Sequence, residues 1–331
     1  MTDPSSLFLI GGTLAILGIA TGIVYVLQTR YREVINEALV ERFRHRLRGW
    51  WFMFTTLAVA FLIGSAATMV LFMFVGFWAL REFITLVPTR PSDHRSLFWV
   101  FFILTPIQFV LVSYESFFGI DSYSLFSIFL PAVMFLIIPA RIATADDPTR
   151  YFERVAKILM GVFLCTYCLS YAPALMTIEL PAGLDSAYNV RLLFFFILMT
   201  QLGDSFRRLW AQVPVRHPIA PSINRSHTWE GLLGGLATTS LVAAGLYWAT
   251  PGFTPWLAAA AGALICLMGF AGELTLSAIK RDRGVDDYGT LVPGHRGLLD
   301  RIDTICFAAP VFYHFVLFYT KIVTMWAEKV T

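Results

Sequence analysis

Charged residues are scarce in this chain. Asp, Glu, Lys and Arg make up 14% of its 331 residues, whereas about 25% is usual for a soluble domain. Hydrophobic residues make up 57%, with 30 Phe and 9 Trp. A soluble domain of this composition could not cover its own apolar surface. The composition therefore excludes that class and indicates a membrane protein with several spans.

Cysteine is also rare, and its four residues all lie in apolar runs. Cys165 and Cys168 form one C-x-x-C without a second pair or a nearby His, so we expect buried packing rather than a metal or redox site. Internal repeats and low-complexity segments are absent from the sequence. No Lys or Arg precedes the first apolar run, residues 7–27, whereas a secretory signal peptide needs a basic start. We therefore expect an anchor with its N-terminus outside.

The apolar runs predict an all-α, polytopic membrane protein with about ten transmembrane helices. Residues 50–83 are too long for a single span, and Gly64 is expected to divide them. The predicted spans are 7–27, 50–64, 66–83, 97–117, 124–140, 156–178, 189–205, 233–250, 253–279 and 302–323.

Lys and Arg are distributed unevenly between the connections of these helices. Alternate connections hold 22 of the 25 Lys and Arg residues, namely 28–50, 81–96, 141–157, 205–227 and 280–301. Cytoplasmic connections carry the excess of positive charge in membrane proteins, so these five are predicted to face the cytoplasm. The expected location is the cell (inner) membrane, with several passes and the N-terminus outside.

The segment 28–50 contains six Arg and no Lys, with a loose apolar stripe. We expect it to form a basic interfacial helix on anionic membrane lipid. Because the segment lies between two spans, no binding of nucleic acid is expected. The polar connection 141–157 is the best candidate boundary. The predicted regions are 1–49, with an extra transmembrane anchor and the basic interfacial helix; 50–140, with N-terminal transmembrane helices; and 141–331, which carries the motifs.

Residues 272–303 contain 12 Asp, Glu, Lys, Arg or His in 32 positions, where one apolar run ends and another begins. Ionisable residues at a membrane edge are costly unless they have a partner or a function. Glu273 and Lys280 share one helical face, and Asp300 and Asp303 lie one turn apart. Carboxylates around a glycine-rich loop suit Mg²⁺, and the neighbouring cations suit phosphate oxygens. The alternative is a solvated loop whose charges pair with one another or with lipid headgroups.

A second polar segment, residues 223–235, reads INRSHTWEGLLGG. Its polar turn leads into a glycine-rich helix start, whose free amides favour anions, and Thr228 is placed to cap the helix. A plain helix cap with close helix packing at glycine is the alternative. Upstream, Asp204 ends an apolar run and can pair with Arg207 or Arg208 at i+3 and i+4.

The segment 272–303 resembles the C-terminal signature of the phosphatidate cytidylyltransferase (CDP-diacylglycerol synthase) family, S-x-x-K-R-x4-K-D-x-G-x-x-[LIF]-P-x-H-G-G-x-x-D-R-x-D. The chain departs from this signature at Asp286, where the family has Lys, and at Arg296, where it has Gly. Glu273 stands where the family has Asp. The residues in register are Ser277, Lys280, Arg281, Asp287, Gly289, Pro293, His295, Gly297, Asp300, Arg301 and Asp303.

The segment 223–235 is similar to the family's S-P-x-K-T-W-E-G-x-x-G-G. Asn224, Arg225 and His227 replace the family's Ser, Pro and Lys. An acidic residue resembling Asp204 ends the corresponding upstream helix in the family. The matching residues are Thr228, Trp229, Glu230, Gly231, Gly234 and Gly235. The resemblance covers roughly residues 50–325.

The resemblance implies an enzyme that transfers CMP from CTP to phosphatidate at the cytoplasmic rim of the membrane, with residues 141–331 as the catalytic transmembrane region. It implies Mg²⁺ as cofactor and leaves open a second, monovalent ion and a homodimer. The implied metal ligands are Glu273, Asp300 and Asp303. The implied catalytic residues are Lys280, Arg281, His295, Asp300 and Asp303. The implied substrate-binding residues are Asp204, Asn224, His227, Thr228, Glu230 and Arg301.

Two other functions stay open. One is a related enzyme with another lipid phosphate as acceptor. The other is a family member without catalytic activity that acts as a membrane interaction protein. The departures from the family motifs at Arg225, Glu273, Asp286 and Arg296 support this interpretation. A transporter is a weaker alternative, because its paired charges should lie at mid-membrane, whereas these are predicted at the rim.

Overall fold

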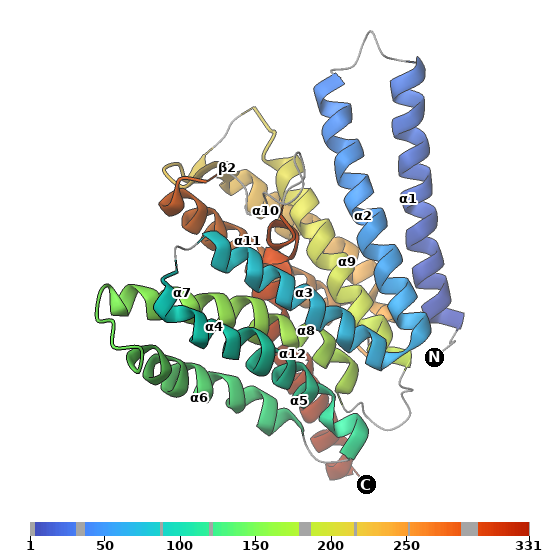
Figure 1. Cartoon of the computed structure of the whole chain (residues 1–331). Helices are drawn as coiled ribbons and strands as arrows, with labels where there is room; N and C mark the ends of the chain where they lie inside the picture. The colour runs from blue at the N-terminus through green and yellow to red at the C-terminus, as the bar shows by residue number, and fades with distance from the viewer. Residues whose placement is uncertain are drawn as a thin grey trace.

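Helices account for nearly all of the regular structure in this computed structural model (Figure 1). The structure describes residues 4–30, 37–86, 89–118, 122–178, 187–214, 217–250, 252–285 and 297–330. Each predicted span overlaps one helical stretch in these ranges. The four cysteines are buried and free, which confirms the packing interpretation.

The first three helices follow the predicted division of the N-terminal apolar runs. Gly64, between the second and third helices, has a φ of 137°, a value that residues with a Cβ rarely adopt. The predicted break at this glycine is therefore confirmed. The helices are α1 (Pro4–Arg30), α2 (Glu37–Ile63) and α3 (Ser65–Leu86).

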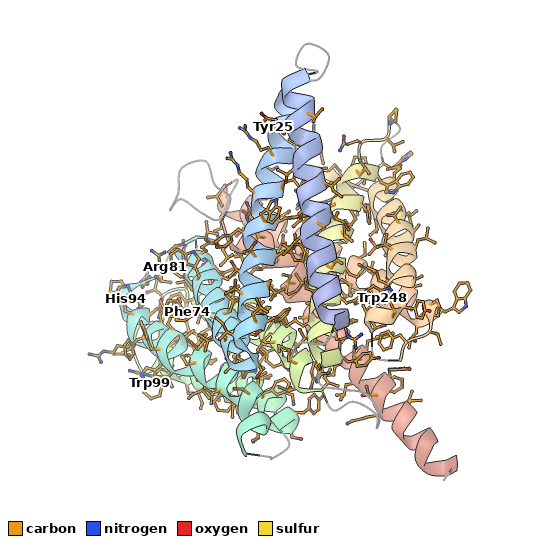
Figure 2. The ribbon with its side chains drawn as sticks, turned by 90° about the vertical axis from the view of Figure 1, so that its right-hand side faces the viewer. Tyr25, Phe74, Arg81, His94, Trp99 and Trp248 are labelled. Atoms are coloured by element: carbon orange, nitrogen blue, oxygen red, sulfur yellow. The ribbon has the colours of Figure 1, made fainter. Side chains whose placement is uncertain are left out.

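The basic segment was predicted to form a separate interfacial helix, but four of its six arginines, Arg42, Arg44, Arg46 and Arg48, lie in α2 together with the next apolar run. Residues 31–36 of the segment lie outside the described part of the chain. α2 runs without a break, so the arginine-rich residues are its first turns. No proline interrupts them, and a helix that has started gains a hydrogen bond with each added residue. α1 and α2 form a hairpin that reaches beyond the other helices in both views, with Tyr25 towards its far end (Figures 1 and 2). Trp51 of α2 donates to Thr21 of α1 at 3.0 Å.

Three helical rods follow in the middle of the chain. Two of them contain a π-helical stretch, a feature that is often found near functional positions. The first rod comprises η1 (Pro91–Asp93), α4 (His94–Trp99), η2 (Val100–Leu104) and α5 (Thr105–Phe118). The second rod is α6 (Ser122–Ala143). The third comprises α7 (Tyr151–Val162), η3 (Phe163–Cys168), α8 (Leu169–Ala174) and η4 (Leu175–Thr177).

A buried ion pair joins the first and third of these rods. Arg154 Nη2 donates to Asp93 Oδ1 at 2.8 Å. The same guanidinium donates to the backbone carbonyls of Asp147 and Thr149. A buried pair contributes to stability only when its remaining donors are satisfied, and these contacts satisfy them. The pair therefore fixes the connection between α6 and α7.

The C-terminal part is an antiparallel hairpin of two short strands among four long helices. The strand pair is an addition to the predicted all-α fold. The sequence did not predict it, because these residues show no alternation of apolar and polar residues. Pro218 pairs with Thr228, and Ala220 with Asn224. The elements are α9 (Ala187–Trp210), β1 (Pro218–Ala220), β2 (Asn224–Thr228), α10 (Trp229–Gly245), η5 (Tyr247–Ala249), α11 (Pro255–Arg283) and α12 (Leu299–Val330).

The helices α9 to α12 pack closely and hold most of the predicted site residues. α11 contacts both α10 and α12, and α10 also contacts α9. At Gly235 of α10, a Cβ would lie 2.5 Å from Cγ of Arg207 on α9. Glycine therefore lets the two backbones approach, as small residues do between helices in membranes.

Six described helical stretches are long and apolar enough to span a membrane. They are Ser65–Leu86, Pro91–Ser113, Tyr123–Ala143, Tyr151–Thr177, Pro255–Arg283 and Leu299–Ile322. The apolar parts of α1 and α2 are shorter, and α10 has 17 residues. The architecture is that of a helical membrane protein, while the predicted count of about ten transmembrane helices is not established.

Candidate active site

The ends of α11 and α12 that carry the predicted acidic residues lie against one another. A Cβ at Gly272 of α11 would lie 2.7 Å from the backbone oxygen of Asp303 on α12, so glycine permits the approach. Lys280 Nζ donates to Asp300 Oδ1 at 2.7 Å. Glu273, Lys280 and both aspartates therefore gather from two neighbouring helices.

Two arginines of α9 hold Glu273. Nη2 of Arg207 donates to Oε2 at 3.1 Å, and Nη2 of Arg208 donates to Oε1 at 2.9 Å. Asp204 accepts from Nε of Arg208 at 2.8 Å, and Nη2 of Arg207 lies 3.8 Å from the same oxygen. The pairing of Asp204 at i+3 and i+4 that the sequence allowed is therefore present.

Asp303 is the acidic residue of this cluster with the least compensation. It is 7% exposed, and its carboxylate accepts from the backbone N–H of Thr304 at 2.7 Å. The ion pairs formed by the described residues involve Glu273 and Asp300 but not Asp303. An uncompensated buried charge is costly. Arg208 interacts electrostatically with Asp303 without forming an ion pair, so the charge balance favours a further cation beside this carboxylate.

The described part of the chain contains no group of three His, Cys, Asp or Glu residues arranged to hold a metal ion. Glu273 is occupied by the two arginines, and Asp300 by Lys280. Mg²⁺, however, usually binds through one or two carboxylates together with water and substrate phosphates. A buried Asp303 with Asp300 one turn away suits that mode. The assignment of Mg²⁺ stays a prediction about the complex with a triphosphate.

The strand hairpin rests on α11 next to this cluster. Asn224 Nδ2 lies 3.2 Å from Nε2 of His227 and 3.5 Å from Oγ of Ser277. The His227 ring packs edge-on against Phe270, with centroids 5.6 Å apart. Ser277 and Phe270 both belong to α11. These two residues lie four positions after and three positions before Glu273 on the same helix, so the hairpin lies beside this part of the cluster.

His227 is neutral in this environment, because burial lowers the pKa of its imidazole. Oδ1 of Asn224 accepts from the N–H and hydroxyl of Ser226 at 3.0 and 2.7 Å, so the amide nitrogen of Asn224 faces the ring as a donor. Nε2 of His227 then accepts, which is the role of an unprotonated ring nitrogen. This part of the site therefore offers neutral polar groups.

Thr228 and Glu230 occupy the start of α10. Oγ1 of Thr228 accepts from the N–H of Gly231 at 3.1 Å, which confirms the predicted cap. Glu230 accepts from the backbone N–H and Nδ1 of His217, and these hydrogen bonds lower the pKa of Glu230 to about 2. Its described contacts lie outside the cluster around Glu273.

The remaining predicted residues have different surroundings. Nε of Arg281 donates to the backbone oxygen of Ile223 at 3.4 Å and links α11 to the strand hairpin. Arg301 is exposed, and its guanidinium lies against α2, where a Cβ at Gly49 would be 1.9 Å from Nη1. His295 belongs to residues 286–296, which lie outside the described part of the chain.

Sequence reasoning missed two features of this site. Arg207 and Arg208 were considered as partners of Asp204, but not of Glu273, which lies 65 or 66 residues away in sequence. Glu82 of α3, which contacts the start of α12, was not singled out. The signal for it was the single acidic residue of α3, which follows Arg81 near the end of an apolar run, because ionisable residues in such runs mark functional positions by default.

The chain is similar in sequence to known proteins. A model of the cytidylyltransferase family matches residues 44–319. YnbB, an uncharacterized protein of Escherichia coli (strain K12), is 33% identical over 274 residues, which cover 82% of this chain and 86% of YnbB.

Two similar proteins carry the name phosphatidate cytidylyltransferase. That of Mycobacterium bovis is 42% identical over 166 residues, which cover 49% of this chain and 50% of that protein. Phosphatidate cytidylyltransferase 4, chloroplastic, of Arabidopsis thaliana is 31% identical over 209 residues, which cover 57% of this chain and 52% of that protein. The chain thus spans about half the length of each of these two relatives.

Proposed function

The chain belongs to the cytidylyltransferase family, and from this premise we propose that it transfers CMP from CTP to phosphatidate, which gives CDP-diacylglycerol and pyrophosphate. The observation that carries the proposal is the gathering of Lys280, Asp300 and Asp303 at the joined ends of α11 and α12. Phosphoryl-transfer enzymes act mainly by positioning and by stabilising charge. The resemblance to phosphatidate cytidylyltransferases selects the acceptor.

The proposed reaction is an in-line substitution at the α-phosphorus of CTP. A phosphate oxygen of phosphatidate forms the new P–O bond. The bond from the α-phosphorus to the bridging oxygen breaks, and pyrophosphate leaves with the electron pair. A phosphate monoester has its second pKa at about 6, so the attacking oxygen is already ionised near neutral pH. The site therefore needs cations and alignment rather than a strong base.

Each part of the cluster has a proposed role. Lys280 and Arg281, at the end of α11, contact phosphate oxygens. Asp303, with Asp300, would hold Mg²⁺. When bound, this ion neutralises the triphosphate and orients the leaving group. The neutral groups of the strand hairpin, with Asn224 as donor, contact the cytosine or the lipid headgroup.

The proposed orientation places the site on the cytoplasmic side of the cell (inner) membrane, where CTP is available. Its support is the excess of Lys and Arg in alternate connections. The basic first turns of α2 are proposed to contact anionic lipid. A reporter fused at Asp146 is expected inside, and one fused after Thr331 outside. Both reporters on one side of the membrane would contradict this orientation.

The decisive experiment is a turnover assay on the purified protein in mixed micelles of detergent and phosphatidate. Labelled CTP is supplied with and without Mg²⁺, and the lipid product is identified by mass spectrometry. Asp303→Asn should lower turnover by about a hundredfold or more, as loss of a group that stabilises transition-state charge does. The matched control is Asp282→Asn, because Asp282 is 69% exposed and pairs with Arg283 next to it.

The outcomes separate the competing functions. CDP-diacylglycerol formation that requires Mg²⁺ and Asp303 supports the proposal. A product with another lipid phosphate, but none with phosphatidate, indicates a related cytidylyltransferase. Folded protein that consumes no CTP with any acceptor indicates a family member without catalysis. Full activity of Asp303→Asn would show that the proposed site is wrong.

A further inference from the structure

Glu82 lies in the apolar helix α3, yet it contacts the start of the helix that carries the acidic site residues. Its Oε1 accepts from the backbone N–H of Leu298 at 3.0 Å, and its Oε2 accepts from the N–H of Leu299 at 2.8 Å. The side chain is buried, at 4% exposure. Trp78, one turn earlier on α3, donates its indole N–H to Oε1 at 3.2 Å.

These hydrogen bonds stabilise the buried carboxylate of Glu82 without an ion pair. The ion pairs of the described residues do not include Glu82. Its carboxylate instead accepts from backbone N–H groups at the start of α12, where the helix dipole favours negative charge. A side chain 216 residues away in sequence thus performs the part usually taken by a local cap residue.

We propose that Glu82 is a positioning residue for the site, and that it acts by fixing the first turn of α12. Asp300 directly follows Leu299 in the chain, and Asp303 is one turn further on. A shift of the Leu299 N–H therefore carries both aspartates with it. The proposal rests on the proposed transfer of CMP, because only that reaction gives the position of the aspartates a catalytic meaning.

The helix carrying the aspartates is held from two sides. Lys280 of α11 holds Asp300, and Glu82 of α3 holds the two residues before it. The N-terminal helices, which contain no recognised motif, therefore contribute to the geometry of the site through this carboxylate as well as through the contact of α2 with Arg301.

The test compares Glu82→Gln and Glu82→Ala with the wild type in the full-length protein. Glutamine keeps one acceptor oxygen but turns an NH₂ group towards the other N–H, and alanine removes both acceptors. A misplacement of about 1 Å costs about a hundredfold in rate. We therefore expect kcat per folded molecule to fall about tenfold for Glu82→Gln and about a hundredfold for Glu82→Ala. Hydrogen exchange of the amides at residues 298–303 should quicken, while exchange in α9 stays unchanged.

Asp93→Asn is the matched control, because Asp93 is an equally buried carboxylate in the N-terminal half that pairs with Arg154 away from α12. It should lower the melting temperature and leave kcat per folded molecule unchanged. Wild-type kcat in both Glu82 variants, or unchanged exchange at 298–303, would overturn the proposal. If the wild type itself consumes no CTP, the proposed function fails, and the exchange measurement alone decides whether Glu82 caps α12.

Discussion

Glu273→Gln is the sharpest test of the cluster between α9 and α11. The substitution preserves the size of the side chain and removes its charge. In the structure each oxygen of Glu273 accepts from one guanidinium, Arg207 at 3.1 Å and Arg208 at 2.9 Å. Glutamine can keep one of these hydrogen bonds, and its NH₂ group then faces the other arginine. The variant therefore leaves a buried guanidinium without its main partner.

The expected loss in the free energy of unfolding depends on the contacts that the two arginines keep in the variant. Removing one partner of a buried ion pair costs about 3–5 kcal/mol. Arg207, 5% exposed, keeps the carbonyl of Cys266 at 3.0 Å and the more distant Asp204 at 3.8 Å. Arg208 is 41% exposed, so solvent screens its share. We therefore expect the loss of stability to lie at or below the lower end of that range, at about 2–3 kcal/mol.

The assay is thermal unfolding in detergent, followed by intrinsic fluorescence at one fixed scan rate. With about 2.1 cal/mol/K of unfolding entropy per residue, each kcal/mol corresponds to about 1.4 °C in Tm for a chain of 331 residues. Glu273→Gln should therefore melt about 3–4 °C below the wild type. Asp282→Asn is the matched control, because Asp282 is 69% exposed and pairs with Arg283 next to it, and its Tm should barely change. A Tm for Glu273→Gln equal to that of the control would refute the reasoning.

Two further predictions concern other parts of the site. Gly49→Val should displace the guanidinium of Arg301, because even a Cβ would lie 1.9 Å from Nη1, and turnover should fall as it does in Arg301→Ala. The control Gly18→Val, with open space around its Cβ, should keep its turnover. Equal turnover of the two glycine variants would contradict the contact between Gly49 and Arg301. Burial lowers the pKa of His227 in the folded state below its ordinary 6.5, so the unfolded state binds the proton more readily. The stability of the folded state is therefore undiminished above about pH 6.5 and decreases as the pH falls towards the folded-state pKa. The Tm of the wild type should therefore fall on acidification from about pH 7.5 to about 5.5 by more than that of His227→Gln, and parallel curves would exclude this residue as the cause.

Local features of the fold were predictable because their causes are local. The break at Gly64 and the cap at Thr228 each depend on one residue and its immediate neighbours, and both are present. The separate basic helix was predicted from composition, but composition does not end a helix. The continuous α2 shows that an amphipathic segment without a stop signal simply joins the apolar run that follows.

The contacts that define the site were not predictable, because they join residues far apart in sequence. Glu273 meets Arg208 across 65 positions, and Glu82 meets Leu298 across 216. Neither pair produces a periodic pattern or a short motif. The motif resemblance named Asp300, Asp303 and Glu273 together as metal ligands, but it carried no information about the two arginines of α9 that contact Glu273.

The departure at Glu273 bears on the alternative that the protein is a family member without catalytic activity. That alternative draws on Glu273, where the family has Asp. The extra methylene extends the carboxylate by about 1.5 Å, and in this chain its two oxygens reach two guanidinium groups on α9. Glu273 and the arginine pair are therefore parts of one arrangement, in which the carboxylate is fixed and charge-balanced rather than lost. Because both oxygens of Glu273 accept from arginines, the departure gives this carboxylate a structural role in the cluster. The turnover assay, rather than the identity of this residue, therefore separates a catalytic from a non-catalytic protein.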